Sequence, residues 1–178
     1  MHKEGLGLAL ARYAVEVEPH NAIVEVGSWM GASAWHLAEG SGVETEIHLY
    51  DRWCANQSEV DKLKKWGVDV EVGADLLPLV QMNLLGFGDR IHYHKGDVRQ
   101  QRYTGKQDIA LYVDDASKNQ ISNVLPNFRS RFVPGCIVIL CDYFFPPCDK
   151  HRRYVEGLGW ELLERDEYDD NVAIWRAE

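Results

Sequence analysis

The sequence predicts an α/β fold: a seven-stranded sheet, mostly parallel with an antiparallel C-terminal hairpin, and helices on both faces. Three observations predict it. Apolar strand-like runs alternate with segments of helical periodicity along most of the chain, a rhythm typical of a parallel sheet covered on both sides. A strand, a glycine-containing turn and a helix stand near the start, and two strand-like runs joined by a polar turn close the sequence.

Length and composition favour one domain over residues 1–178. The chain has 178 residues, of which 46% are hydrophobic, enough for one sizeable core and too few for two. A formal net charge of −9 leaves no basic stripe for a phosphate backbone, so nucleic acid is excluded as the main partner. No run is long enough to span a membrane. The four cysteines lack C-x-x-C spacing, which favours reduced thiols and a cytoplasmic protein.

The spacing of the apolar residues predicts the helices and strands along the chain. Residues 1–20 hold a leading helix, which Pro19 ends. The closing hairpin would pair Trp160–Asp166 with Val172–Trp175 across the polar turn Glu167–Asn171. Between the leading helix and this hairpin we expect five strands, at Ala22–Val26, Ile47–Tyr50, Ile91–His94, Ile109–Asp114 and Cys136–Asp142.

One long stretch lacks a clear apolar period. Residues 52–73 contain Trp53, Trp66 and a short charged run. Loops of this length are uncommon in compact domains unless they are functional. We therefore expect an irregular segment that serves as a lid or acceptor loop, with its two tryptophans at the rim of a pocket.

A glycine turn follows the first predicted strand. Gly27 would permit a tight turn and close approach of a ligand to the backbone, and free N–H groups near Gly31 would face that ligand at a helix N-terminus. The spacing is Gly-x-x-x-Gly rather than Gly-x-Gly-x-x-Gly, which argues against NAD. The whole run reads Asn21-Ala22-Ile23-Val24-Glu25-Val26-Gly27-Ser28-Trp29-Met30-Gly31-Ala32-Ser33.

The segment Val24–Ser33 resembles the first motif of class I S-adenosylmethionine-dependent methyltransferases, and is most similar to small-molecule O-methyltransferases of the macrocin and catechol type. The resemblance implies a Rossmann-like fold, S-adenosylmethionine as cofactor, and methyl transfer to an oxygen of a small-molecule acceptor. Later segments fall in that family's order over nearly the whole chain: Asp51, Gly96-Asp97-Val98, Tyr112-Val113-Asp114-Asp115 and Pro134-Gly135.

Three carboxylates have distinct expected roles toward this cofactor. Glu25 would accept the ammonium group, Asp51 at a strand end would accept both ribose hydroxyls, and Asp97 would meet the adenine amino group. Their alternative roles are capping or ordering the turn for Glu25, an N-cap or loop position for Asp51, and a simple turn residue for Asp97. The predicted cofactor-binding residues are Glu25, Gly27, Ser28, Trp29, Gly31, Ser33, Asp51, Asp97 and Val98.

The polar ends of the fourth and fifth predicted strands would supply the chemistry. Methyl transfer to a hydroxyl group needs a positioned acceptor and a base that removes its proton. Asp114 and Asp115 are the predicted catalytic residues. In relatives of the macrocin and catechol type, carboxylates at these strand ends bind magnesium, so the resemblance implies Asp114 and Asp142 as metal ligands.

The chain departs from that pattern at three positions. Cys141 stands where relatives carry an acidic residue, and a thiol is a poor magnesium ligand. Ala116 replaces a second acidic residue, and Ser117 stands where relatives carry His or Lys. Metal dependence therefore stays open. In an alternative role, Asp115-Ala116-Ser117 caps the next helix, with Ser117 as the N-cap residue.

Two other functions compete with methyl transfer. A cofactor-binding module or partner subunit that has lost catalysis would explain Cys141 and Ala116. An NAD-type protein with an irregular glycine turn is the third reading. The identity of the acceptor and the association of two copies into a homodimer are left open by the sequence.

Overall fold

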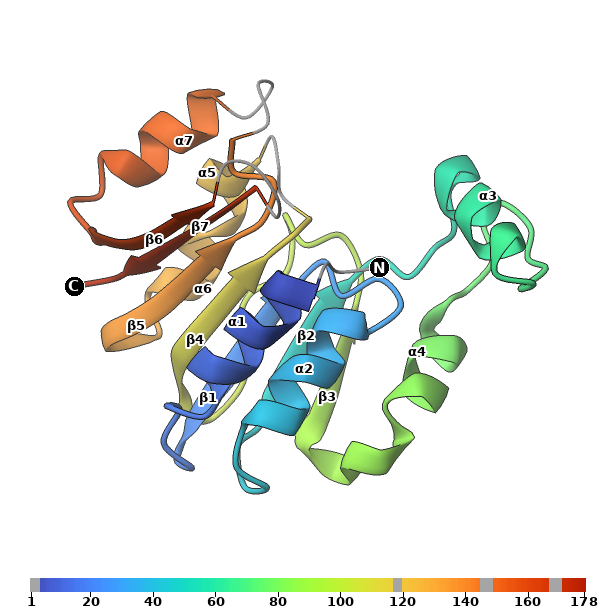
Figure 1. The fold of residues 1–178 in the computed structure, drawn as a ribbon, viewed down its shortest axis with the longest axis horizontal. Coiled ribbons are helices and arrows are strands. Elements are labelled where there is room, and N and C mark those ends of the chain that lie inside the picture. The colour runs from blue at the N-terminus through green and yellow to red at the C-terminus, as the bar shows by residue number, and fades with distance from the viewer. Residues whose placement is uncertain (1–3, 117–119, 145–148, 167–170) are drawn as a thin grey trace.

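A seven-stranded sheet forms the centre of the molecule in the computed structural model, which describes residues 4–116, 120–144, 149–166 and 171–178 (Figure 1). Its strand order is β3-β2-β1-β4-β5-β7-β6. Strands β1 to β5 pair in parallel, and β7 runs antiparallel to both β5 and β6. The predicted fold class is therefore confirmed. The strands are β1 Asn21–Val26, β2 Ile47–Asp51, β3 Ile91–Lys95, β4 Asp108–Asp114, β5 Phe132–Leu140, β6 Glu161–Asp166 and β7 Val172–Arg176.

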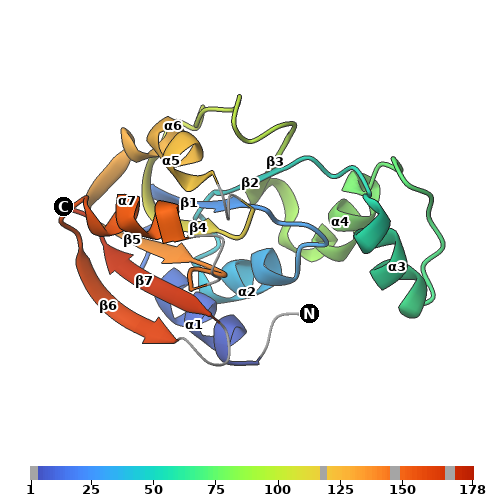
Figure 2. The same ribbon diagram turned by 90° about the horizontal axis from the view of Figure 1, so that it is seen from above.

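Helices cover both faces of the sheet (Figure 2). Helices α1, α2 and α4 contribute to one apolar core, and α5, α6 and α7 contribute to the other. None of the described helices is long and apolar enough to cross a membrane. The helices are α1 Glu4–Ala14, α2 Ala32–Gly40, α3 Gln57–Lys65, α4 Leu77–Asn83, the 3-10 helix η1 Leu85–Arg90, α5 Ile121–Val124, α6 Pro126–Arg129 and α7 Asp149–Glu156.

The alternation of side chains along β1 explains the position of its one acidic residue. Successive residues of a strand point to opposite faces of the sheet. Val24 and Val26 belong to the core beneath α5 and α6, whereas Ile23 belongs to the core beneath α1 and α2. Glu25, two residues after Ile23, therefore lies on the α2 face, at the end of the strand that leads into that helix.

The predicted irregular segment contains a helix. Helix α3 begins after Asn56, whose side chain accepts the Glu59 N–H at 3.0 Å while the Glu59 carboxylate accepts the Asn56 N–H at 2.7 Å. This reciprocal capping box gives two backbone N–H groups at the start of the helix their hydrogen-bond partners. In both views α3 lies to one side of the sheet, beyond β3 (Figures 1 and 2).

Strand β5 begins earlier than its apolar run predicts. It starts at Phe132, so Pro134 and Gly135 lie inside the strand instead of opening it. Phe132 pairs with Ile109 and Ile137 pairs with Leu111, so the pairing with β4 shifts register between these two points. The strand ends at Leu140, two residues before the predicted end. The predicted turn of the closing hairpin falls largely on residues 167–170, outside the described residues.

Candidate cofactor site

The carboxyl ends of β1, β2 and β4 meet at one edge of the sheet. In the strand order, β1 has β2 on one side and β4 on the other. In open α/β sheets, ligands bind outside the carboxyl ends of the strands where the order of the strands reverses. Val26, Asp51 and Asp114 end the three strands at this edge.

Gly27 allows the ends of β1 and β4 to approach closely. Its φ is 93°, and a Cβ atom here would lie 2.7 Å from the backbone nitrogen of Ala116. Any other residue would therefore be strained and would collide with the segment after β4. The Gly27 N–H donates to the Tyr50 carbonyl at 2.8 Å, and the Asp115 N–H donates to the Val26 carbonyl at 2.9 Å. These bonds tie the turn to both neighbouring strand ends.

The rest of the turn folds back to start α2. The Gly31 N–H donates to the Ser28 carbonyl at 2.7 Å, and Trp29 between them has a φ of 39°. The side chains of Ser28 and Ser33 are both buried, at 3% exposure each. The Ser28 hydroxyl makes no hydrogen bond. The turn thus places the two serine side chains in the interior next to the end of β1.

Glu25 lies in this interior without a partner. Its side chain is fully buried, and neither carboxylate oxygen makes a hydrogen bond. The pKa of Glu25 is raised to about 7, mainly by burial and also by nearby Asp115 and Asp51. The neighbouring Ser33 and Ser28 hydroxyls act in the lowering direction, although neither is in hydrogen-bonding geometry with the carboxylate. A buried carboxylate without a partner is costly, so the site favours either a proton on Glu25 or a cation beside it.

Asp51 organises the backbone around the turn. Its Oδ2 accepts the Trp29 N–H at 2.9 Å, and its Oδ1 accepts the Trp53 N–H at 2.7 Å. The Trp53 indole in turn donates to the Trp29 carbonyl at 2.9 Å. Trp53 is only 1% exposed, so it holds the turn against β2 instead of standing at a pocket rim. Trp66 is 48% exposed, and its ring lies 5.4 Å from that of Trp29.

Asp97 and Val98 follow β3, the strand beyond β2. The Asp97 carboxylate forms an ion pair with the Arg99 guanidinium and accepts the Arg99 N–H at 3.0 Å. These hydrogen bonds lower the pKa of Asp97 to about 2. Val98 is half-buried and packs against the core on the α5 and α6 face. Asp97 therefore has a local partner, and β2 separates both residues from the glycine turn.

The end of β4 carries the two predicted catalytic residues in different surroundings. Asp114 is 4% exposed, and its Oδ2 accepts the Tyr112 hydroxyl at 2.9 Å while its Oδ1 accepts the Ala116 N–H at 3.2 Å. Asp115 is half-buried at the end of the same strand, beside Gly27. Asp114 is therefore buried within the fold, whereas Asp115 is partly exposed.

Cys141 and Asp142 follow β5. The Cys141 N–H donates to the Asp114 carbonyl at 2.9 Å, which extends the pairing of β4 and β5. Burial, together with the surrounding carboxylates, raises the pKa of the Cys141 thiol, so the sulfur keeps its proton and is a poor ligand for magnesium. Asp142 has a φ of 52°. Within the described residues, Asp114 and Asp142 do not join a third acidic, histidine or cysteine side chain in a close group of metal-binding atoms.

No family model matches the sequence, and no curated protein matches it either. Solved structures do match. CalS11, a TDP-rhamnose 3'-O-methyltransferase of calicheamicin biosynthesis, is 20% identical, with a TM-score of 0.65 over 96% of this chain and 76% of its own. The O-methyltransferase NovP is 17% identical, with a TM-score of 0.69 over 96% of this chain and 78% of its own. TomG from Streptomyces achromogenes, an O-methyltransferase in complex with SAM, is 15% identical, with a TM-score of 0.65 over 99% of this chain and 81% of its own.

The chain has a methyltransferase fold. The similarity covers nearly all of it and includes the antiparallel C-terminal strands. On this methyltransferase fold, the predicted residues of the glycine turn and Asp51 form one connected group through their hydrogen bonds. Asp114 and Asp115 lie at the adjacent strand end, tied to β1 through Val26.

Sequence reasoning assigned Trp53 the wrong role and missed Tyr112, and both residues shape the site on this methyltransferase fold. Trp53 bonds to both Asp51 and Trp29 from within the segment expected to be a loop. Tyr112 holds Asp114 from two residues earlier on β4, and it is fully buried. The alternation of β4 does place Tyr112 and Asp114 on one face, so that contact could have been found. The contacts of Trp53 depend on a turn with positive φ, for which the sequence carries no signal. Ser117 lies outside the described residues.

Proposed function

We propose that this protein transfers the methyl group of S-adenosylmethionine to an oxygen atom of a small-molecule acceptor. The observation that carries the proposal is Glu25: a fully buried carboxylate without a hydrogen bond, beneath a glycine turn on a methyltransferase fold. The ammonium group of the cofactor would supply the missing partner. The electron-deficient methyl group of the sulfonium is the chemistry that the cofactor brings when bound.

The residues around Glu25 suit the rest of this ligand. The backbone around Gly27 is the proposed contact for the amino-acid portion, and Gly27 brings it close to the segment after β4. Asp51 already accepts two N–H groups, and a carboxylate offers about four acceptor positions, so it retains capacity for ribose hydroxyls. Asp97, with the Val98 N–H, remains the proposed contact for adenine. Ser28, Trp29, Gly31 and Ser33 complete the proposed cofactor-binding turn.

Asp115 is the proposed general base. Asp114 uses one oxygen for Tyr112 and the other for Ala116, so its proposed role is to fix the end of β4. Asp115 is half-buried beside Gly27 and would accept the proton of the acceptor hydroxyl as the hydroxyl oxygen attacks the methyl carbon. The carbon–sulfur bond breaks as the carbon–oxygen bond forms, and the sulfide leaves neutral.

A magnesium ion at Asp114 and Asp142 is a separate part of the proposal. Asp114 ends β4, Asp142 follows the neighbouring strand β5, and carboxylate oxygens suit magnesium. The protonated Cys141 between them adds no ligand of the right kind. Activity that survives a chelator would refute the metal and leave the role of Asp115 standing.

The segment 52–73 is the proposed lid over the acceptor. Its exposed Trp66 lies against Trp29 of the glycine turn, and Lys62 of α3 lies 5.3 Å from the same ring. A flat aromatic surface beside the cofactor turn suits a ring-shaped acceptor such as a phenol or a sugar.

A protein that binds the cofactor without catalysis is the second candidate. The protonated thiol of Cys141 favours it, because a thiol at this position after β5 is a poor ligand for magnesium. Turnover separates the two candidates, since both require the cofactor.

Binding of S-adenosylhomocysteine, measured by calorimetry, tests the cofactor site. Glu25→Gln keeps the shape of the side chain and removes its charge, so affinity should fall about ten- to a hundredfold. Glu44→Gln, at an exposed position before β2, is the matched control and should bind like the native protein. Native protein that does not bind this ligand would refute both candidates.

Transfer of a labelled methyl group to a panel of phenols, catechols and sugars tests the reaction. Asp115→Asn should lower turnover about 10²- to 10⁴-fold while cofactor affinity stays close to native. A variant as active as the native protein would remove Asp115 from the reaction. Cofactor binding without turnover of any acceptor would favour the non-catalytic candidate.

A further inference from the structure

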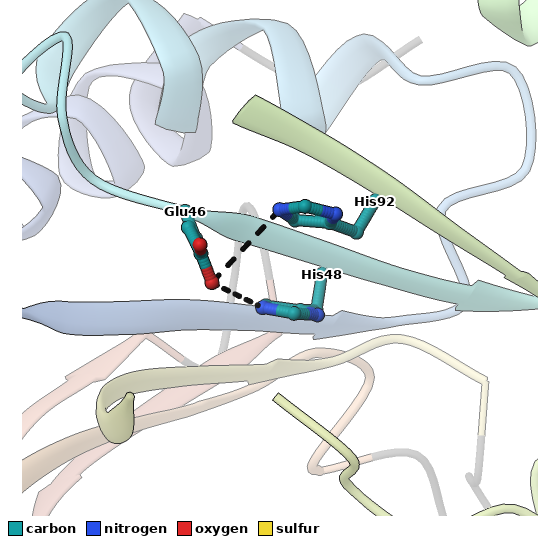
Figure 3. A group of neighbouring side chains, drawn as sticks. All are labelled: Glu46, His48 and His92. Atoms are coloured by element: carbon teal, nitrogen blue, oxygen red, sulfur yellow. Dashed lines mark hydrogen bonds and ion pairs between the residues drawn. The ribbon is translucent and has the colours of Figure 1, made fainter. Parts of the chain in front are cut away.

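A second group of polar side chains lies at the opposite end of β2. Glu46 directly precedes β2, His48 is its second residue, and His92 is the second residue of β3. His48 pairs with His92 in the register of the two strands, which places both side chains on the same face of the sheet. We call Glu46, His48 and His92 the histidine cluster (Figure 3).

The ligand atoms of the histidine cluster converge on one carboxylate oxygen. The Oε2 of Glu46 lies 3.3 Å from the Nε2 of His48 and 3.9 Å from the Nε2 of His92 (Figure 3). All three ligand atoms lie within 4.8 Å of one another. The two imidazole rings stack with their centroids 4.5 Å apart, so both present the same edge to Glu46.

His92 has an unsatisfied nitrogen in this cluster. Its Nε2 is buried and makes no hydrogen bond, although a third of the side chain is exposed. Buried polar nitrogens normally have a partner. His48 is 4% exposed, and its Nδ1 lies 3.0 Å from the Nε2 of His94. A bond donated by His48 Nδ1 to His94 would leave a lone pair on His48 Nε2, facing the Glu46 carboxylate.

Two arrangements of protons fit these contacts. In the first, His48 donates to His94, and the two lone pairs of His48 and Glu46 face each other, which is favourable only with a cation between them. In the second, His94 donates to His48, which donates to Glu46, and no cation is needed. The second arrangement leaves His92 Nε2 without a partner, whereas a cation satisfies all three groups.

We propose that Glu46, His48 and His92 bind a divalent transition-metal ion such as Zn²⁺. Two imidazoles and one carboxylate are a known ligand set for zinc with one open position. Ligands at zinc distances stand roughly 3.3 Å apart in a tetrahedral site. His48 and Glu46 already have this separation, and His92 must move inward by on the order of 1 Å. Its partly exposed ring has the freedom to do so.

The surroundings fit a bound ion at the edge of the sheet. His94 would orient His48 from behind, as partners of metal-binding histidines usually do. The ring of Tyr103 lies 5.0 Å from His48, and its buried hydroxyl makes no hydrogen bond. Magnesium does not suit this site, because imidazole favours zinc, copper and nickel.

This site is separate from the proposed cofactor site. Glu46 and Asp51 lie at opposite ends of β2, about 16 Å apart for five extended residues. A metal ion here would join β2 to β3, its outer neighbour in the sheet. The proposed role is therefore to stabilise this side of the sheet, and it does not depend on methyl transfer.

Titration of the chelator-treated protein with Zn²⁺ and Co²⁺ tests the proposal. Calorimetry should give one ion per chain, and the cobalt spectrum should show visible bands without thiolate charge transfer. His92→Ala and Glu46→Gln should each weaken binding at least about tenfold. His20→Ala, an exposed histidine before β1, and Cys54→Ser are the matched controls and should bind like the native protein.

Histidine NMR signals of the native protein give a test that needs no variant. Zinc should shift the imidazole signals of His48 and His92 and leave those of His20 and His36 in place. Three results would each overturn the proposal. The first is native zinc affinity in both His92→Ala and Glu46→Gln, and the second is loss of zinc binding in Cys54→Ser. The third is that the His48 and His92 signals do not change at saturating zinc.

Discussion

Glu25 has an acid–base behaviour that follows from its place in the fold. An ordinary glutamate titrates well below neutral pH, but burial raises the pKa of Glu25 to about 7. An ammonium group beside the carboxylate favours the charged form and lowers this pKa. Binding of the proposed cofactor and loss of the Glu25 proton are therefore linked.

We predict that S-adenosylhomocysteine releases a proton from Glu25 when it binds. Below pH 7 the free protein is protonated at Glu25 and the complex is not, so release should approach about one proton per ligand near pH 6 and vanish by about pH 8. Calorimetry in two buffers with different ionisation enthalpies measures this number. Glu25→Gln should abolish the release, while Asp51, Asp115 and Cys141, the other titratable groups near Glu25, remain in the variant. Equal release in both proteins would assign the proton elsewhere.

Single residues differ in how far their roles could be predicted. Asp51 was predicted as a functional residue because a carboxylate at the end of a parallel strand faces the ligand edge. The hydrogen bonds that it makes to Trp29 and Trp53 could not be predicted, because they depend on two residues with positive φ. His48 and His92 are visible as histidines within two predicted strands. Their contact depends on cross-strand register, which neither strand specifies alone.

The elements were predicted where the apolar pattern is strong. Strand β1 was expected at Ala22–Val26 and begins one residue earlier. Helix α3 was missed because Leu63 is its only fully buried residue, so its apolar period is weak. The capping signal was nevertheless present, since Asn56 and Glu59 have the three-residue spacing of a capping box.

Helices α1 and α2 pack closely because Gly40 has no side chain. A Cβ atom at Gly40 would lie 2.7 Å from the Cα of Ala11. Alanine normally stabilises a helix by about 1 kcal/mol relative to glycine. Here it would force the backbones of the two helices apart.

We therefore expect Gly40→Ala to destabilise the protein by about 1–3 kcal/mol, against its helix propensity. Urea unfolding followed by circular dichroism measures the change. Gly42→Ala is the control, because a Cβ atom there meets only Thr45 Oγ1, at 3.6 Å, and its stability should be close to native. A stabilised Gly40→Ala variant would show that the two helices separate without cost.

At the scale of the whole molecule, the segment from Trp53 to Leu76 forms a unit beside the sheet. Two backbone contacts join its ends. Cys54 and Asp75 form an isolated antiparallel β-bridge, and the Leu76 N–H donates to the Trp53 carbonyl at 2.9 Å. Helix α3 within it buries little apolar surface. The strand order of the sheet, by contrast, was not predicted, because apolar runs do not show which strands are neighbours.

Hydrogen exchange should separate this unit from the sheet. We expect the amides of α3 to exchange at least about tenfold faster than those of β1 and β4, through local opening that is insensitive to low denaturant concentrations. Mass spectrometry of peptides from the exchanged protein measures both rates. Exchange of α3 only at the rate of global unfolding would show that the unit is an integral part of the core.

The position of β7 between β5 and β6 sets an order for folding. Strand β6 comes before β7 in the chain, but it joins the sheet only through its pairing with β7. Hairpins close within about 1–10 μs, so β6 and β7 would form as a pair before docking on β5. Until then the edge of β5, with its run from Ile137 to Leu140, is unprotected. An exposed apolar edge can pair with another chain, which makes this the point where aggregation during refolding would begin.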